Sequence, residues 1–261
     1  MKIQVNVNAV LYVPEQVATV FQIEPPSIIG AQMVEVNQIS ISPYCDLEPF
    51  EDLYGNLCRR SMLPGGECVL TYGAMVELDE SRSPMVQASD PDPLTMPPDI
   101  LHYLLPSRYC ESDRLSQMAQ SEFGRTKPGF ARVRTICDWI NEHILYSYGM
   151  SNVSTTACDT ALERIGVCRD FAHLAIGFCR SMGIPARYVS GYCLELDPPD
   201  FHAFFQAWLD GRWVSFDATE MQPRPALITV ATGRDAADCA WCTFFGPGST
   251  RSLEVTVAAV D

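Results

Sequence analysis

The stretch that decides the fold is Gly166-Val167-Cys168-Arg169-Asp170, which opens an apolar helical segment. Behind it, large apolar side chains recur at three- and four-residue steps, as one buried face of a helix requires. Gly183 and Pro185 then mark the end of the segment, since a glycine and a trailing proline commonly terminate helices. The residues of the apolar face are Phe171, Leu174, Ala175, Phe178 and Met182. A thiol therefore stands in the first turn of a predicted buried helix.

A predicted β-hairpin follows this helix. The segments His202–Leu209 and Arg212–Phe216 flank Asp210-Gly211, a dipeptide that favours a two-residue hairpin turn. If it forms the turn, the register and the two-residue period of side chains bring His202 and Asp217 to one face. They become diagonal neighbours with Cα atoms roughly 7–8 Å apart. An imidazole and a carboxylate bridge that gap readily.

These three residues form a candidate catalytic set. Unpaired backbone N–H groups and the positive end of the dipole favour a thiolate at Cys168 and could hold a developing oxyanion. Asp217 could accept a hydrogen bond from one ring nitrogen of His202 and leave the other for the thiol. We expect Cys168 as nucleophile, His202 as base and acid, and Asp217 as the orienting carboxylate.

Other reactive side chains fit structural roles better. His173 is five residues beyond Cys168, about 140° around a helix, and we expect it to pack on another face. For Asp170 we favour local capping or an ion pair over catalysis. The pair Cys239-Ala240-Trp241-Cys242 has metal-like spacing, but zinc would need two further ligands. Packing is the favoured interpretation of that pair, with a metal or a redox pair as alternatives, and we expect no cofactor.

Composition bounds the class of protein. The chain has 261 residues, of which 47% are hydrophobic, enough for a substantial core. A net charge of −14 argues against nucleic acid and anionic membranes as partners. The count of 11 cysteines is odd and no export signal is recognisable, so we expect reduced thiols and a cytoplasmic location.

Three regions follow from the patterning. Residues 1–88 alternate and carry turn signals, which predicts a small all-β sandwich. Residues 89–110 continue a proline-rich connection that begins near Ser83 and disfavours regular helix. Residues 111–261 form the predicted α+β catalytic domain. Ser112-Asp113 is expected to cap a helix that runs to about Phe123, and Pro128 to lie in the first turn of the next helix.

The chain resembles the transglutaminase-like superfamily, and within it the bacterial branch described as putative cysteine proteases. The resemblance rests on Gly166–Leu174, Phe201–Ala203 and Phe216–Thr219. It extends to the following segments: Gly183–Tyr192, Trp213, Gly233–Asp238 and Asp52–Asn56 with Val69–Glu77. The resemblance implies a papain-like core with a Cys-His-Asp triad, preceded by an N-terminal β domain.

One departure is Phe204, where many members of the superfamily have Trp, and we expect it to affect packing or substrate fit. Tyr146 and Tyr148 are candidate second oxyanion donors through their hydroxyl groups.

The leading hypothesis is a thiol-dependent amide hydrolase, a cysteine protease or amidase, that acts on a peptide or another amide through an acyl-enzyme. A transglutaminase or another amide-forming acyl transferase is one alternative. A binding module that keeps the fold without turnover is the other. The sequence does not specify the substrate, the role of the N-terminal domain or the oligomeric state.

Overall fold

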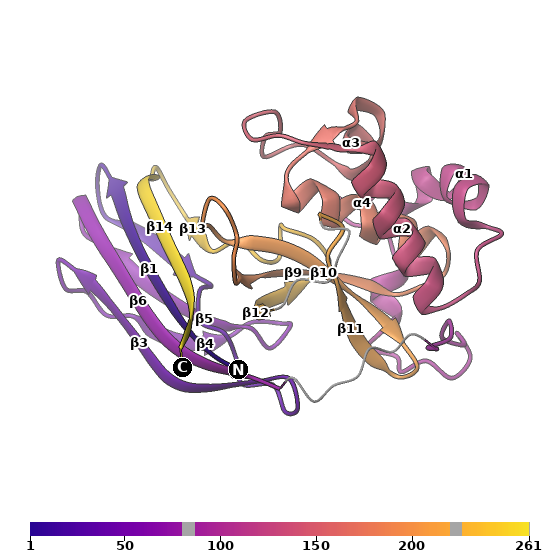
Figure 1. Ribbon diagram of the computed structural model, residues 1–261. Helices are drawn as coiled ribbons and strands as arrows, with labels where there is room; N and C mark the ends of the chain where they lie inside the picture. Colours follow the sequence, from indigo (N-terminus) through magenta and orange to yellow (C-terminus); the bar gives the residue numbers. More distant parts are fainter. Residues whose placement is uncertain (80–86, 220–225, 261) are drawn as a thin grey trace.

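A computed structural model describes residues 1–79, 87–219 and 226–260. In this part of the chain, two antiparallel four-stranded sheets hold both ends of the sequence (Figure 1). The first has the order β14-β1-β6-β3, with β1 Lys2–Val13, β3 Gln32–Ser42, β6 Gly66–Leu78 and β14 Ser249–Val260. The second has the order β13-β2-β5-β4, with β2 Val17–Phe21, β4 Glu48–Glu51, β5 Leu57–Leu63 and β13 Cys242–Phe244.

The strands occupy corresponding places in the two sheets, because the chain passes directly from a strand of one sheet into a strand of the other. β1 continues into β2 after residues 14–16, and β5 continues into β6 after residues 64–65. Every second side chain of β1 is buried: Ile3, Val5, Val7, Ala9, Leu11 and Val13. Full burial of a larger aliphatic side chain contributes roughly 1.5–3 kcal/mol. The N-terminal region is therefore the all-β unit that its alternating sequence predicts.

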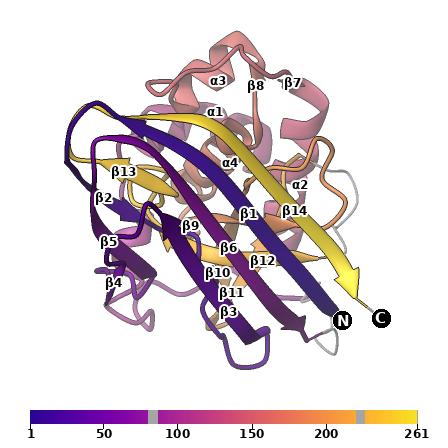
Figure 2. The ribbon, with the colours of Figure 1, turned by 90° about the vertical axis from the view of Figure 1, so that its left-hand side faces the viewer.

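The C-terminal strands lie elsewhere than the sequence analysis expected. β14 pairs with β1 from Lys2↔Val260 onward, and β13 pairs with β2. Figure 2 shows β14 beside β1, with the two termini close together. Residues 242–260 thus complete the N-terminal sheets instead of the catalytic sheet, because β14 supplies a partner for the edge of β1. The remaining division, 1–88, 89–110 and the start of a catalytic domain at 111, stays a prediction. Residues 83–86 of the proline-rich connection lie outside the described residues.

The second layer contains a mixed set of helices and strands. A short 3-10 helix, Leu101–Leu104, precedes the α-helices α1 Ser112–Phe123, α2 Phe130–His143, α3 Ala157–Glu163 and α4 Cys168–Ser181. The sheet has the order β11-β10-β9-β12, with β9 Ala186–Cys193, β10 His202–Leu209, β11 Arg212–Phe216 and β12 Leu227–Gly233. A two-residue parallel pair joins β7 Leu145–Tyr146 to β8 Ile165–Gly166. The largely buried α4 packs against β9, β10 and the other three α-helices, as its apolar sequence predicts.

Two buried amide side chains join the N-terminal sheets to β12. Gln32 donates to the carbonyl of Thr229 at 2.8 Å and accepts from its N–H at 2.9 Å. Asn56 does the same with Thr232, at 2.9 and 2.7 Å. β12 is an edge strand of its sheet, so these amides take the place of a neighbouring strand. They fix the β unit against the catalytic layer.

Candidate active site

The β10–β11 hairpin has the predicted register. Asp210 and Gly211 have φ angles of 44° and 77°, the positive values that a type I′ turn requires at both positions. The ladder runs from Leu209↔Arg212 to Phe205↔Phe216. The residue that follows β11 is Asp217, which this register brings to the face of His202. The sequence-based register is confirmed.

His202 and Asp217 form a buried hydrogen-bonded pair. Nε2 of His202 lies 2.7 Å from Oδ2 of Asp217, and the two side chains are 1% and 4% exposed. The other carboxylate oxygen accepts hydrogen bonds from the backbone N–H and the hydroxyl of Thr219, at 2.9 and 2.7 Å. Asp217 is therefore held on both oxygens and fixes the orientation of the imidazole.

The environment of the pair favours its charged forms. Burial lowers the pKa of His202, but hydrogen bonds and charge from Asp217 and Cys168 outweigh it and raise the pKa to about 9. Burial raises the pKa of Asp217, but His202 and Thr219 outweigh it and hold this pKa below its usual value. Nδ1 of His202 makes no hydrogen bond of ordinary geometry within the described residues. This leaves Nδ1 as the nitrogen available to the nearby thiol.

Cys168 is the first residue of α4 and is half-buried. It lines a cleft of about 540 Å³ together with His202. The other lining residues are Tyr109, Val153, Arg169, Tyr188, Ser190, Asp200, Phe201, Ala203, Ala236, Cys239, Ala240, Trp241, Cys242 and Leu253. The cleft thus opens between the start of α4, one end of β10 and the C-terminal segment that leads into the N-terminal sheets.

Asp170 lies where local capping requires it. Its Oδ2 accepts the backbone N–H of Val167 at 2.9 Å, and its Oδ1 lies 2.9 Å from Nη2 of Arg169. The carboxylate is fully buried and does not line the cleft. The expected capping and ion-pair contacts of Asp170 are therefore both present.

His173 packs behind the cleft and does more than fill space. Its fully buried ring stacks on Tyr109 at a centroid distance of 5.1 Å and lies 5.2 Å from the ring of Tyr188. Nε2 accepts the backbone N–H of Ala236 at 3.1 Å, which requires an unprotonated nitrogen. Burial, followed by the charge of Arg169, lowers the pKa of His173 to about 3. His173 therefore anchors the cleft-lining segment at Ala236, a contact that local sequence spacing does not reveal.

Tyr146 and Tyr148 differ in their relation to the thiol. Burial and then the neighbouring Cys168 raise the pKa of Tyr146, whereas Tyr148 is 53% exposed. Neither residue is among those that line the cleft. Tyr146 is therefore the better placed of the two candidate oxyanion donors, and the role itself stays a prediction.

The cysteines at 239 and 242 are free thiols that both line the cleft. Burial raises the pKa of Cys239 and brings that of Cys242 to about 12, so both favour the neutral thiol. Among the described residues, no group of three or more His, Cys, Asp or Glu side chains could hold a metal ion. These features agree with the packing interpretation of the pair.

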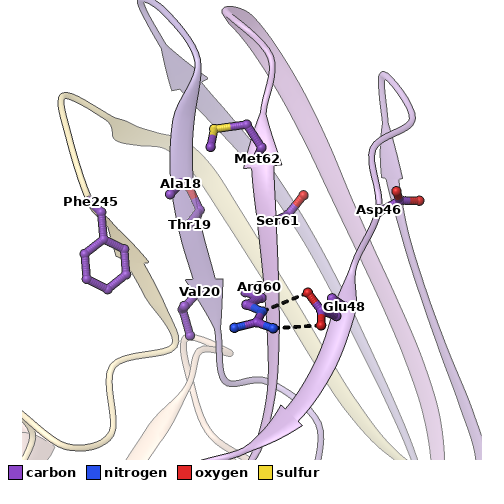
Figure 3. Close-up of a pocket in the computed structure, with 9 residues that line it drawn as sticks. All are labelled: Ala18, Thr19, Val20, Asp46, Glu48, Arg60, Ser61, Met62 and Phe245. Carbon is purple, nitrogen blue, oxygen red and sulfur yellow. Dashed lines mark hydrogen bonds and ion pairs between the residues drawn. The ribbon is translucent and has the colours of Figure 1, made fainter.

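A second hollow lies on the N-terminal unit, away from these residues. It has a volume of about 370 Å³ and lies over β2 and β5 (Figure 3). Its walls include the ion pair of Arg60 with Glu48 and the apolar side chains of Met62 and Phe245. The described residues that line this hollow include no cysteine and no histidine, the side chains on which the predicted nucleophilic chemistry depends.

The family profile described as the transglutaminase-like superfamily matches residues 116–218, which include Cys168, His202 and Asp217. The crystal structure of a "putative cysteine protease" from Cytophaga hutchinsonii is 36% identical, with a TM-score of 0.92, over 100% of this chain and 91% of that one. The chain belongs to the transglutaminase-like superfamily, and its fold is that of a thiol enzyme.

Two mycobacterial relatives match over a shorter region. An uncharacterized protein of Mycobacterium leprae (strain TN) is 36% identical over 132 residues, 46% of this chain and 46% of its own length. One from Mycobacterium tuberculosis (strain ATCC 25618 / H37Rv) is 34% identical over 143 residues, 49% of this chain and 45% of its own. The chain thus spans about half the length of these curated relatives. No helix in the described residues is long and apolar enough to cross a membrane.

Proposed function

We propose that the protein is a thiol-dependent amide hydrolase, a cysteine protease or amidase, with Cys168, His202 and Asp217 as its catalytic triad. The observation that carries the proposal is that His202, hydrogen-bonded to the buried Asp217, lines one cleft together with a thiol at a helix N-terminus. Such a pair holds an imidazolium next to a thiolate, the reactive form of a cysteine nucleophile.

The proposed reaction proceeds in two halves. The thiolate of Cys168 attacks the amide carbonyl carbon, and the resulting oxyanion is stabilised by backbone N–H groups at the start of α4. The imidazolium of His202 gives its proton to the leaving amine, the C–N bond breaks, and a thioester remains. Water then loses a proton to His202 as it attacks the thioester, and the acid product leaves with the thiolate restored. Asp217 keeps Nε2 protonated and stabilises the imidazolium throughout.

We favour hydrolysis and keep transamidation as the alternative, because no motif in the sequence marks a site for an acceptor amine. The substrate we propose is a peptide or another amide, in a cytoplasmic protein without nucleic-acid or membrane partners. The net charge of −14 supports the last part, since both of those partners attract basic surfaces.

Alkylation by iodoacetamide at slightly acidic pH tests the proposal, because ordinary thiols are protonated there and react slowly. We expect one fast adduct, on the peptide that contains Cys168, and its loss in Cys168→Ala. Cys179→Ala is a matched control, since it removes a fully buried thiol of the same helix. Fast labelling that persists in Cys168→Ala would assign the reactive thiol to another position. Uniformly slow labelling would favour a binding module without turnover.

A further inference from the structure

Two rings of an aromatic stack, those of Phe201 and Trp241, line the cleft beside the predicted base. The Phe201 ring, adjacent in sequence to His202, lies between those of Tyr192 and Trp241, at centroid distances of 5.2 and 5.7 Å. The interplanar angles are 28° and 19°, so the three rings are stacked. Within the described residues, no second ring and no guanidinium stacks on Trp241. The indole at the end of the stack is therefore available to a ligand in the cleft.

A carboxylate without a cationic partner lies beside these rings. Asp200 lines the same cleft, and its Oδ1 accepts the backbone N–H of Phe201 at 2.7 Å. No Lys, Arg or His of the described residues forms an ion pair with it. Asp200 is exposed at the edge of the cleft; partial desolvation there raises its pKa and outweighs the hydrogen bond from Phe201, which lowers it.

Among the described residues that line the cleft, Arg169 carries a guanidinium, and a carboxylate already pairs with it. Nε and Nη2 of Arg169 bind Oδ1 of Asp170 at 3.1 and 2.9 Å, and Nη2 also donates to the carbonyl of Asn152 at 2.8 Å. Asp200 is therefore a cleft carboxylate that no Lys, Arg or His side chain pairs with in the described part of the chain. The charge of −14 on the whole chain adds a field of the same sign.

These features select the chemistry of the occupant. An apolar group against Trp241 would remove water from Asp200 without replacing its hydrogen bonds, which is unfavourable. A cationic nitrogen interacts favourably with both side chains, since it pairs with the carboxylate of Asp200 and is attracted to the face of the Trp241 indole. An anionic group would be repelled.

We propose that the cleft selects substrates with a positively charged nitrogen group next to the scissile amide, such as a Lys or Arg side chain, held by Asp200 and Trp241. This inference rests on the proposed function, because a scissile amide exists only if the protein is an amide hydrolase. The charge preference of the cleft itself can be measured without turnover.

Three methanethiosulfonates test the preference: a trimethylammonioethyl reagent, a neutral ethyl reagent and a sulfonatoethyl reagent. In each, the thiolate of Cys168 attacks the sulfenyl sulfur, forms a mixed disulfide and releases methanesulfinate. The rate on the Cys168 peptide is followed by mass spectrometry and divided by the rate of the same reagent with free cysteine. We expect the corrected cation-to-neutral ratio to be roughly five- to tenfold, and the anion to be the slowest.

Asp200→Asn should bring this ratio close to one, and Trp241→Leu should lower it in part. Glu163→Gln is the matched control, because it removes an equal charge at the exposed end of α3 and should leave the ratio unchanged. A ratio of one or less in the unmodified protein, or an unchanged ratio in Asp200→Asn, would overturn the inference even if Cys168 is hyper-reactive. If Cys168 reacts slowly with all three reagents but the ratio still depends on Asp200, the result would contradict the proposed function and support the cation site.

Discussion

Oδ2 of Asp217 accepts a hydrogen bond from Nε2 of His202 over 2.7 Å, and the ring's second nitrogen has no ordinary hydrogen bond among the described residues. The pair fixes which nitrogen carries the orienting bond and which one is left for chemistry. Because Thr219 holds the second oxygen of Asp217, the carboxylate cannot rotate without losing two further hydrogen bonds. Substitutions at Asp217 and at Thr219 can therefore distinguish the charge of the carboxylate from the hydrogen bonds that hold it in place.

Asp217→Asn should lower kcat by a factor on the order of 10³–10⁴, because the amide no longer stabilises an imidazolium. The pKa of His202 should fall below its value of about 9, since hydrogen bonding and charge from Asp217 help to raise it. Steady-state kinetics and an NMR titration of the imidazole C–H signals measure both. Thr219→Val is the matched control, for which we expect a loss of roughly tenfold or less, since the charged carboxylate remains. Equal losses in the two variants would contradict an electrostatic role for Asp217.

His202 should make stability depend on pH on the alkaline side. Its pKa in the folded protein, about 9, is above the unfolded value near 6.5. The stabilisation is therefore complete below pH 6.5 and is lost as the pH rises through 9; it is on the order of 3 kcal/mol. Urea denaturation between pH 6 and pH 10 measures it. The difference in free energy of unfolding between the unmodified protein and His202→Gln should shrink as the pH rises across this range. A constant difference would show that protonation of His202 does not stabilise the folded state.

His173 should have the opposite dependence. Its folded pKa of about 3 is below the unfolded value, so its contribution is present above pH 6.5 and is lost as the pH falls toward 3. His173→Phe keeps a ring between Tyr109 and Tyr188 but leaves the N–H of Ala236 without its acceptor, at a cost of roughly 1–3 kcal/mol at pH 7. In urea denaturation from pH 4 to pH 7, the free energy of unfolding of His173→Phe should depend less on pH than that of the unmodified protein. An equal pH dependence would show that another group controls the loss of stability in acid.

Asn56→Ala should lower the free energy of unfolding, because it removes one of the two amides that join the N-terminal sheets to β12. The substitution leaves the N–H and the carbonyl of Thr232 buried without their partner, which costs roughly 2–4 kcal/mol. Asn6→Ala removes an exposed amide that bonds only Thr256 within the described residues, and it should change stability by about 0.5 kcal/mol or less. Chemical denaturation compares the two. Similar values would contradict the role of Asn56 as a substitute for a neighbouring strand.

The features of the molecule that are predictable from its sequence are those set by local geometry. Asp210-Gly211 determines the turn, the turn determines the register, and the register brings His202 and Asp217 together within 15 residues of chain. The start of α4 at Cys168 follows in the same way from its apolar period. Even there the finest detail differs: α1 begins at Ser112, but the capping position is Glu111.

The remaining features depend on contacts between distant segments. β14 pairs with β1 across 258 residues at Lys2↔Val260, and its alternating sequence does not specify which edge it joins. Trp241 directly precedes β13, and its carbonyl accepts the N–H of Gln22 where β13 pairs with β2, so its position also depends on a distant segment. Gln32 and Asn56 are ordinary polar residues in sequence, and they gain their role because no described strand pairs with the outer edge of β12. No local pattern could have revealed these three relationships.

The most direct test of the central claim is acyl-enzyme trapping with an activated ester such as p-nitrophenyl acetate. The protein is quenched in acid within the first turnover and the peptides are mapped by mass spectrometry. We expect one acetyl group on the peptide that contains Cys168, accumulation of this adduct in a burst, and its absence in Cys168→Ala. An acetyl group on a different residue, with none on Cys168, would rule out Cys168 as the nucleophile.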